Sequence, residues 1–294
     1  MLVSTAGMTR LARDAGYAVP AVNVFDDLSM RAVVAAAEAE SAPLIVQISV
    51  KTVRLIGADF TTAMFRNAVK EASVPIALHL DHCPDRGVID EIIRQGWSSV
   101  LFDASNRELA DAERETAEVV AAAHAAGVDV ESEIENIIGV EDGVGSDVSL
   151  HSYTVEELAD IARRTGVDLI APQLGTAHGE YRSQPHLLPE RARDLAARTP
   201  LPIVLHGGTG LSAEEFTSFI DAGVSKINIS TRVKLSYMQA AAEHLDRARD
   251  GGKWDPLAMF RDMGSAVQAA IAEHIAEFGA SGRADATRAA LETA

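Results

Sequence analysis

Three histidines, His82, His178 and His206, each stand at or just beyond the end of an apolar run. Neutral imidazole is a common zinc ligand, and a set of three leaves one position of a tetrahedral zinc open for substrate. If the runs are strands of one parallel sheet, their ends lie at the same edge and the three side chains can meet. A lone histidine at a strand end is usually structural, so the indication of zinc rests on the three together.

Carboxylates accompany these histidines. Asp81 precedes His82 and should point elsewhere than its ring, where it can act on a hydroxyl of a metal-bound substrate. Glu131 and Glu133 share one face of their run, and Asp103 ends the run before it. These carboxylates are candidate ligands for a second or alternative metal position. The alternative is that they orient the histidine ligands.

Two close neighbours of His82 are expected to play no chemical part. His79 lies three positions earlier, and the alternation of a strand predicts that it points to the opposite side. Cys83 is the single cysteine of the chain, so an internal disulfide is excluded. No set of acid–base partners points at this thiol, and we interpret it as a small structural residue rather than a sulfur ligand or nucleophile.

A glycine-rich acidic segment is a candidate for a moving part. Residues 138–145 read Ile-Gly-Val-Glu-Asp-Gly-Val-Gly, with three glycines around an acidic pair. This composition is typical of a mobile loop, which would carry the carboxylate of Glu141 into a site on closure. A solvated acidic turn is the alternative interpretation.

Two further segments offer a phosphate site. Residues 207–210 read Gly-Gly-Thr-Gly, and residues 228–231 read Asn-Ile-Ser-Thr. Backbone N–H groups and threonine hydroxyls are suitable donors to phosphate. Lys226 and Lys234 are possible countercharges. In α/β barrels the loops after the seventh and eighth strands recurrently bind phosphate, so the position of these segments strengthens the indication.

The candidates must be positioned by alternating strands and helices. Amphipathic helical patterns separate short apolar runs, and strands that are apolar on both faces are typical of a parallel sheet covered by helices. Eight strand–helix units in about 230 residues favour a closed (β/α)8 TIM barrel over an open doubly wound sheet. The expected strands are residues 18–24, 43–49, 75–82, 98–102, 128–134, 168–174, 202–206 and 224–229.

No linker or low-complexity segment divides the chain, which predicts one α/β barrel domain over residues 1–294. About residues 254–294 form a C-terminal helical extension in this interpretation, and its alanine-rich helices suit packing on a neighbouring subunit or on the same barrel. Barrels carry their chemistry at the carboxyl ends of the strands. Those ends add Asn23 and Ser49 to the candidate substrate-binding residues.

Charge and composition limit the partners. The formal net charge is −17, with 26 basic against 43 acidic residues, which argues against nucleic acid and anionic membranes as partners. A phosphorylated substrate is still compatible, because a phosphate site is local. The N-terminus lacks the pattern of a secretory signal, and no run has transmembrane length, so a cytoplasmic location is expected.

The motifs together resemble those of the class II, zinc-dependent ketose-bisphosphate aldolases, particularly the fructose- and tagatose-bisphosphate group. The resemblance covers nearly the whole chain. It implies reversible cleavage of a ketose (bis)phosphate to dihydroxyacetone phosphate and an aldehyde, which is glyceraldehyde 3-phosphate for fructose or tagatose 1,6-bisphosphate. In family order the motifs are His-Leu-Asp-His at 79–82, Gly-Thr-Ala-His-Gly at 175–179, Leu-His-Gly-Gly-Thr-Gly at 205–210 and Lys-Ile-Asn-Ile-Ser-Thr at 226–231.

The resemblance also implies roles in catalysis. The three histidines would bind a catalytic Zn²⁺, a Lewis acid that makes a Schiff-base lysine unnecessary. Asp81 would move the proton of the aldol hydroxyl, and Glu141 would move the proton on the carbon of dihydroxyacetone phosphate. Asp103 and Glu133 match positions that can take a second metal.

Further implied roles concern the substrate and the assembly. Backbone oxygens near Gly179 and Gly207 are expected to hold a monovalent cation, Na⁺ or K⁺. Relatives place a C-terminal arginine in a neighbour's site, and a homodimer or homotetramer is expected. The candidates for the ketose phosphate are Gly179, Gly207, Thr209, Asn228, Ser230 and Thr231. The candidates for a distal anionic group are Arg182, Lys234 and Arg283.

Departures from the family leave the substrate open. Ser230 stands where many fructose-bisphosphate enzymes carry Asp, and Ile134-Glu135 replaces the usual Leu-Gly before the acidic loop. The same chemistry on another ketose phosphate, such as a deoxy-keto-sugar acid phosphate, is therefore an alternative. A zinc hydrolase is disfavoured by the two phosphate segments. A non-catalytic aldolase-like partner subunit is disfavoured because the ligands and the acid–base pair are all present.

Overall fold

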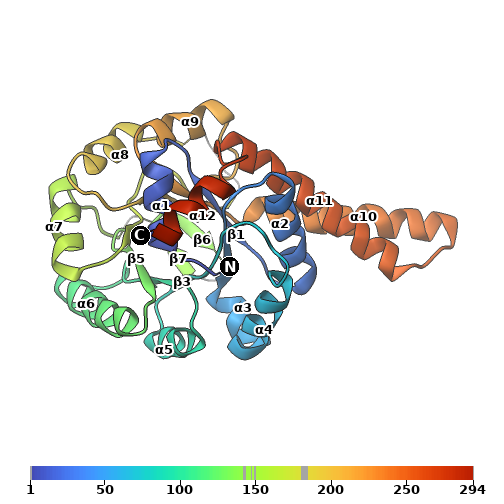
Figure 1. Ribbon diagram of the computed structural model, residues 1–294, viewed down its shortest axis with the longest axis horizontal. Helices are drawn as coiled ribbons and strands as arrows, with labels where there is room; N and C mark the ends of the chain where they lie inside the picture. The colour runs from blue at the N-terminus through green and yellow to red at the C-terminus, as the bar shows by residue number, and fades with distance from the viewer. Residues whose placement is uncertain (1, 142–143, 147, 149, 180–184, 294) are drawn as a thin grey trace.

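Eight parallel strands close into a barrel, which confirms the predicted (β/α)8 fold (Figure 1). The computed structural model describes residues 2–141, 144–146, 148, 150–179 and 185–293, with only the backbone for 140–141 and 144–146. Around the barrel the strands follow the order β1-β10-β9-β8-β5-β4-β3-β2. They are β1 (Val19–Asn23), β2 (Leu44–Ser49), β3 (Ile76–Cys83), β4 (Ser99–Asp103), β5 (Asp129–Glu133), β8 (Leu169–Ile170), β9 (Ile203–Leu205) and β10 (Val224–Ile229).

Helices surround the barrel, and several begin at caps that the sequence itself supplies. Asp26, Thr154 and Ser212 each form a reciprocal capping box with the residue three positions later. The helices are α1 (Thr5–Asp14), α2 (Asp27–Ala39), α3 (Val50–Ile56), α4 (Ala58–Ala68), α5 (Arg86–Gln95), α6 (Leu109–Ala125), α7 (Val155–Thr165), α8 (Pro189–Ala196), α9 (Ala213–Asp221), α10 (Thr231–Gly251), α11 (Pro256–Glu277) and α12 (Ala284–Thr293).

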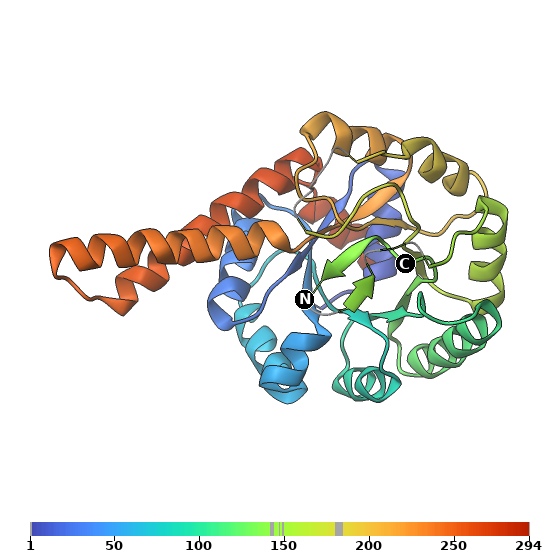
Figure 2. The same ribbon diagram turned by 180° about the vertical axis from the view of Figure 1, so that it is seen from behind.

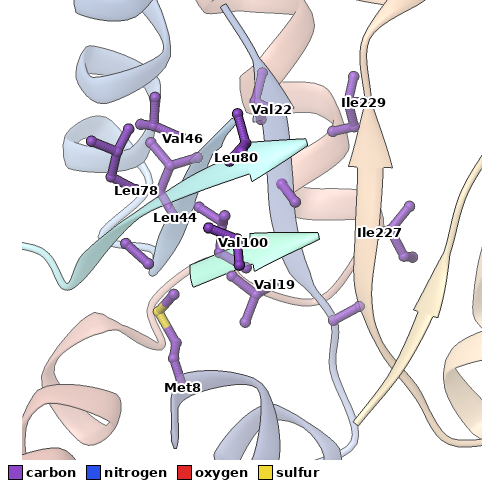
Figure 3. Close-up of a cluster of buried hydrophobic side chains, with 14 of the residues drawn as sticks. Met8, Val19, Val22, Leu44, Val46, Leu78, Leu80, Val100, Ile227 and Ile229 are labelled. Carbon is purple, nitrogen blue, oxygen red and sulfur yellow. The ribbon is translucent and has the colours of Figure 1, made fainter. Parts of the chain in front are cut away.

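Apolar side chains on the strands form the core, as Figure 3 shows for part of it. Leu78 and Leu80 of β3 are buried in this cluster, whereas His79 and Asp81 between and beyond them contact polar groups of other strands. Because successive side chains of a strand point to opposite faces, a run that is buried on both faces can pack helices outside and keep polar groups inside. The barrel interior near the strand ends is therefore polar.

The acidic segment predicted as a loop is a β-hairpin. Strands β6 (Gly139–Glu141) and β7 (Val144–Ser146) pair antiparallel, with Val140 opposite Gly145. Figure 2 shows the hairpin lying across the middle of the barrel. The backbone pairing also sets Gly139 opposite Ser146 and Glu141 opposite Val144, a pairing that the glycine content of the segment concealed.

Two helices extend the fold away from the barrel. Figure 1 shows the far parts of α10 and α11 projecting as an antiparallel arm, while the end of α11 packs beside α2. The arm carries the exposed apolar side chains of Met238, Leu245, Trp254, Leu257 and Phe260. Among the described residues, no helix is both long and apolar enough to cross a membrane.

Candidate metal centre and active site

His82, His178 and His206 converge at the carboxyl ends of the strands. The ring centroid of His82 lies 4.9 Å from that of His178 and 4.7 Å from that of His206, and both pairs are edge-to-face. His82 Nε2 and His206 Nδ1 are 2.9 Å apart. One nitrogen from each of the three rings lies within 4.8 Å of the others, a spacing that suits one metal ion.

A local break in β3 brings His82 into this set. His82 has a φ of 40°, in the left-handed region, and the pairing of β3 with β4 shifts register between Leu80 and Cys83. The break cancels the regular alternation, so His82 joins the same polar interior as Asp81 and His79. The prediction that His79 points away is wrong for this reason: His79 Nε2 lies 3.7 Å from Glu131 Oε2 inside the barrel.

Glu131 orients His206. Glu131 Oε1 lies 2.9 Å from His206 Nε2, and Lys226 Nζ lies 2.8 Å from the other carboxylate oxygen, with all three side chains fully buried. Burial raises the pKa of Glu131, but Lys226 and His206 outweigh it and hold that pKa well below its usual range. Burial lowers the pKa of His206 to about 4, so its ring is neutral, as a zinc ligand must be. Glu131 thus contacts Nε2 of the proposed ligand His206, whereas Nδ1 of that ring faces His82.

Asp103 and Glu133 face the other nitrogen of His82. His82 Nδ1 lies 3.6 Å from Asp103 Oδ2 and 3.5 Å from Glu133 Oε2. Strand pairing sets Asp103 opposite Glu133, as expected from the sequence. With His82 the two carboxylates form a second group that could hold a metal. A neutral imidazole offers one lone pair, so His82 can serve one of the two positions at a time.

The donor set fits a divalent cation. Burial lowers the pKa of His82, but Asp81, Glu133 and Asp103 outweigh it and raise that pKa well above its usual value. Burial raises the pKa of Glu133 well above its usual value, whereas contacts with His82 and Ser105 outweigh burial and lower that of Asp103. Without metal the site thus stabilises a positive charge on His82. Three imidazoles are the donor set of catalytic zinc, and such a cation would replace that charge.

Asp81 is held through both oxygens. Asn23 Nδ2 donates to Asp81 Oδ2 at 2.8 Å, and Asn228 Nδ2 donates weakly to Oδ1 at 3.4 Å. Gln47 Nε2 donates to Asn23 Oδ1 at 2.8 Å, and Lys226 Nζ donates to Asn228 Oδ1 at 2.8 Å. Both amides therefore face the carboxylate with their N–H groups, and Asp81 stays an acceptor at the edge of the metal position.

The start of α10 has the properties of an anion site. Ser230 is the N-cap residue, yet no side chain caps the helix among the described residues, and the buried Ser230 Oγ has no hydrogen-bond partner there. Thr231 is the first residue of the helix. By contrast, Ser212 and Glu215 seal the start of α9 with a capping box. The N–H groups of α10 and the Ser230 hydroxyl are therefore the donors available to a phosphate group.

Backbones pack tightly where the loops after β8 and β9 meet. Gly207 has a φ of 68°, and a Cβ there would lie 2.4 Å from the carbonyl oxygen of Ala177. Gly139, at the base of the hairpin, would place a Cβ 2.9 Å from the carbonyl oxygen of His178, and His178 N donates to Ile138 O at 2.8 Å. The glycines allow the segment that carries His178 to lie between the hairpin and the β9 loop.

Several predicted site residues are not in this set. Ser49 is level with Asp81 across the β2–β3 pair, but its hydroxyl caps α3. Arg283 lies at the opposite end of the barrel, with its guanidinium 5.3 Å from the centre of the Tyr17 ring, which precedes β1. The structure therefore does not bring Arg283 to the site of its own chain. Lys226 cannot be the predicted phosphate countercharge, because it is buried against Glu131.

Other predicted residues are only partly placed. Thr209 is half-buried in the turn after β9, Gly179 lies in the segment after His178, and Lys234 is half-buried in the first turns of α10. The backbone of Glu141 lies in β6. Arg182 lies outside the described residues.

Cys83 is a buried residue next to His82. Its thiol donates to Asp85 O at 3.3 Å, and burial raises the pKa of this thiol to about 12.

Gln47 and Lys226 escaped the sequence analysis as interior residues. Both lie in strands that are buried on both faces: Gln47 in Leu-Ile-Val-Gln-Ile-Ser of β2, and Lys226, the one charged residue of its strand, in Val-Ser-Lys-Ile-Asn-Ile of β10. A large polar side chain in a run buried on both faces needs a buried partner, and this signal could have identified both. The partner itself cannot be read from the run, because it lies on another strand.

Known proteins resemble this chain along nearly its whole length. The family model described as "Fructose-bisphosphate aldolase class-II" matches residues 3–283. A fructose-bisphosphate aldolase of Geobacillus stearothermophilus is 35% identical, covering 96% of this chain and 99% of that protein. One of Staphylococcus epidermidis is 32% identical over the same shares. The crystal structure of the YdjI aldolase from Escherichia coli K12 has a TM-score of 0.84 and 27% identity, covering 97% of this chain and 100% of its own.

Proposed function

Because the chain belongs to the class II fructose-bisphosphate aldolases, we propose that it cleaves fructose or tagatose 1,6-bisphosphate reversibly to dihydroxyacetone phosphate and glyceraldehyde 3-phosphate. Membership makes the chain a metal-dependent carbon–carbon lyase of sugar-phosphate metabolism. The identity of the substrate, fructose or tagatose 1,6-bisphosphate, is our proposal. It is supported by the relatives, whose names specify fructose bisphosphate.

His82, His178 and His206 are the proposed ligands of the catalytic Zn²⁺. When bound, zinc supplies a Lewis acid that polarises the substrate carbonyl and stabilises negative charge. Asp81 is the proposed base for the hydroxyl on the carbon whose bond to its neighbour breaks. Its two amide contacts support this role, because they keep the carboxylate an acceptor and aim it beside His82 and His206.

Glu141 is the proposed group that exchanges the proton on the carbon of dihydroxyacetone phosphate. Support comes from the position of its strand, since the hairpin base is hydrogen-bonded to the segment that carries His178. A carboxylate on a hairpin over the barrel can approach the metal position and exclude water at the same time.

The phosphate of the ketose is proposed to bind at the start of α10, with Gly179, Gly207 and Thr209 of the loops and Asn228 of β10 as further contacts. The uncapped helix start and the unpaired hydroxyl of Ser230, both within the described part of the chain, support this position. Backbone oxygens near Gly179 and Gly207 are the proposed site of a monovalent cation, Na⁺ or K⁺. Such an ion would balance the phosphate charge in this acidic protein.

The convergence of three histidine nitrogens beside a carboxylate held through both oxygens carries the proposal. A coupled assay for dihydroxyacetone phosphate release, run on ketose 1-phosphates and 1,6-bisphosphates with zinc and after EDTA treatment, tests it. We expect zinc-dependent release from fructose or tagatose 1,6-bisphosphate. Release that survives complete removal of metal, or no release from any ketose phosphate, would overturn it.

One alternative function is the same aldol cleavage acting on a different ketose phosphate. Ser230 supplies a neutral hydroxyl where many fructose-bisphosphate enzymes carry a carboxylate, so a substrate with an additional acid group would meet less repulsion here. Cleavage of a deoxy-keto-sugar acid phosphate in preference to the bisphosphates would establish this alternative. A purely structural partner subunit would cleave none of these sugars.

We propose that the chain acts in the cytoplasm as a homodimer or homotetramer. The arm of α10 and α11 supports self-association, because its apolar side chains extend beyond the barrel that could cover them (Figure 1). A second copy can bury an apolar ridge against the same ridge around a two-fold axis.

A further inference from the structure

We propose that Lys226, on the buried strand β10, is a positioning residue that orients Asn228, which contacts Asp81, and Glu131, which contacts the proposed ligand His206. The inference rests on the proposed function for its effect on catalysis, but its structural part does not. Lys226 Nζ lies 2.8 Å from Asn228 Oδ1 and 2.8 Å from Glu131 Oε2. The side chain is completely buried, so water cannot take over either contact.

The first contact decides which way the Asn228 amide faces. An ammonium group has donors and no acceptor, so the amide must present its oxygen to Lys226. Its NH₂ group then faces Asp81, at 3.4 Å from Oδ1, and lies beside the His206 ring, whose two nitrogens are 3.4 and 3.3 Å away. Without Lys226 the amide could turn over and present its oxygen to the carboxylate, which repels it.

The second contact decides which nitrogen of His206 faces the metal position. Glu131 is an acceptor only, so the proton of the neutral His206 ring lies on Nε2, 2.9 Å from Glu131 Oε1. The lone pair on Nδ1 then faces His82 and the ligand set. Lys226 Nζ, 2.8 Å from Glu131 Oε2, is the ionic partner of this fully buried carboxylate, and removing one partner of a buried ion pair is strongly disfavoured.

The other side of Asp81 shows what is specific to lysine. Gln47 performs the corresponding task there, donating to Asn23 Oδ1 at 2.8 Å, and within the described part of the chain its side chain has no carboxylate as a hydrogen-bond partner. A neutral donor is sufficient on that side. On β10 the donor must also balance Glu131, and Lys226 lies two residues from Asn228 on the same strand face, which places one cation between the two acceptors.

The full-length protein with Lys226→Met separates these two tasks when compared with the double variant Glu131→Gln, Lys226→Met. In the single variant we expect zinc affinity to fall about 10- to 100-fold. We expect kcat to fall about 100-fold with a smaller change in KM, because the misdirected amide no longer positions Asp81. The double variant removes the unpaired charge, so it should regain fold and zinc affinity while kcat stays low.

The tautomer of His206 is a readout that needs no substrate. In metal-free wild-type protein, ¹⁵N imidazole spectra should show Nε2 protonated and Nδ1 bare, and Lys226→Met should give a mixture. Lys70→Met, at an exposed surface lysine, is the control that should leave every measurement unchanged. Wild-type zinc affinity and tautomer in a folded Lys226→Met protein would overturn the proposal, as would full recovery of kcat in the double variant. Absence of aldolase activity in the wild type would refute the proposed function and leave the tautomer result intact.

Discussion

Hydrogen bonds orient the Asp81 carboxylate before substrate binds. Two amides donate to its oxygens, and each amide is fixed by a donor on its own carbonyl. Such a chain of partners allows each side chain one orientation, and burial of the residues keeps water from competing. The proposed base thus depends on Gln47 and Lys226, which contact the two amides and not Asp81 itself.

Replacing Asp81 separates proton transfer from metal binding. Asp81→Asn should lower kcat/KM by about 10²- to 10⁴-fold, the usual contribution of general acid–base catalysis. Zinc affinity should change little, because the residue is not a proposed ligand. Steady-state cleavage rates and competition with a zinc chelator measure the two effects. A variant that loses zinc along with activity would contradict this assignment.

Metal stoichiometry tests whether the Asp103–Glu133 pair orients His82 or holds a second ion. Since His82 can lend one lone pair, we expect one zinc per chain by elemental analysis at saturating metal. Asp103→Asn should weaken zinc binding about 10- to 100-fold by releasing the ring. Two zinc ions per chain in the wild type, falling to one in the variant, would establish a second metal site instead.

Loops and strand ends, rather than single side chains, place His178. Its segment pairs with the hairpin base through Ile138 and lies against Gly207. Glu135 strengthens the same region: its carboxylate accepts from Tyr153 N and Gln173 N and pairs with Arg191 at 2.7 Å. Glu135 therefore links the segment after β5 to the segment after β8.

Substitution of Gly207 tests this packing of loops. Gly207→Ala places a methyl group 2.4 Å from Ala177 O, so the β8 segment must move and displace His178. We expect at least a tenfold loss of zinc affinity and cleavage. Gly252→Ala is the matched control, with a φ of 65° and no atom within 4 Å of the added carbon. That control should cost only the backbone strain of about 1–2 kcal/mol. Equal behaviour of both variants would mean that strain, not contact, matters.

At the scale of the molecule, the arm carries a group of exposed apolar side chains that the barrel does not cover. Trp254 and Leu257, 66% and 75% exposed, lie near the turn between α10 and α11, far from the metal position (Figure 1). Exposed apolar groups of this size are common at protein interfaces. A net charge of −17 opposes association of like copies, so an apolar contact has to overcome repulsion.

If the arm forms the proposed interface between copies, a charged residue there should dissociate them. Leu257→Asp is expected to shift the mass measured by light scattering toward the monomer, more strongly at low salt, while the circular dichroism of the barrel stays unchanged. Leu55→Asp is the matched control, since Leu55 is 81% exposed but lies on α3, away from the arm. Dissociation by the control and not by Leu257→Asp would place the interface elsewhere.

Local patterns determined the fold class and much of the candidate set. Strand and helix periodicity, caps such as Ser212 and the register of Asp103 with Glu133 follow from interactions within a few residues or from simple alternation, so they could be predicted. The histidines could be grouped because parallel strands end at one edge.

The tertiary structure alone decided which partner each buried polar group finds. The break at His82, the contacts of Lys226 and the distant position of Arg283 depend on how the barrel closes and how its strands stagger. Those contacts join residues as far apart in the sequence as Tyr17 and Arg283, and no local pattern encodes them. Once burial excludes water, each polar group must take whatever partner the closed barrel places beside it.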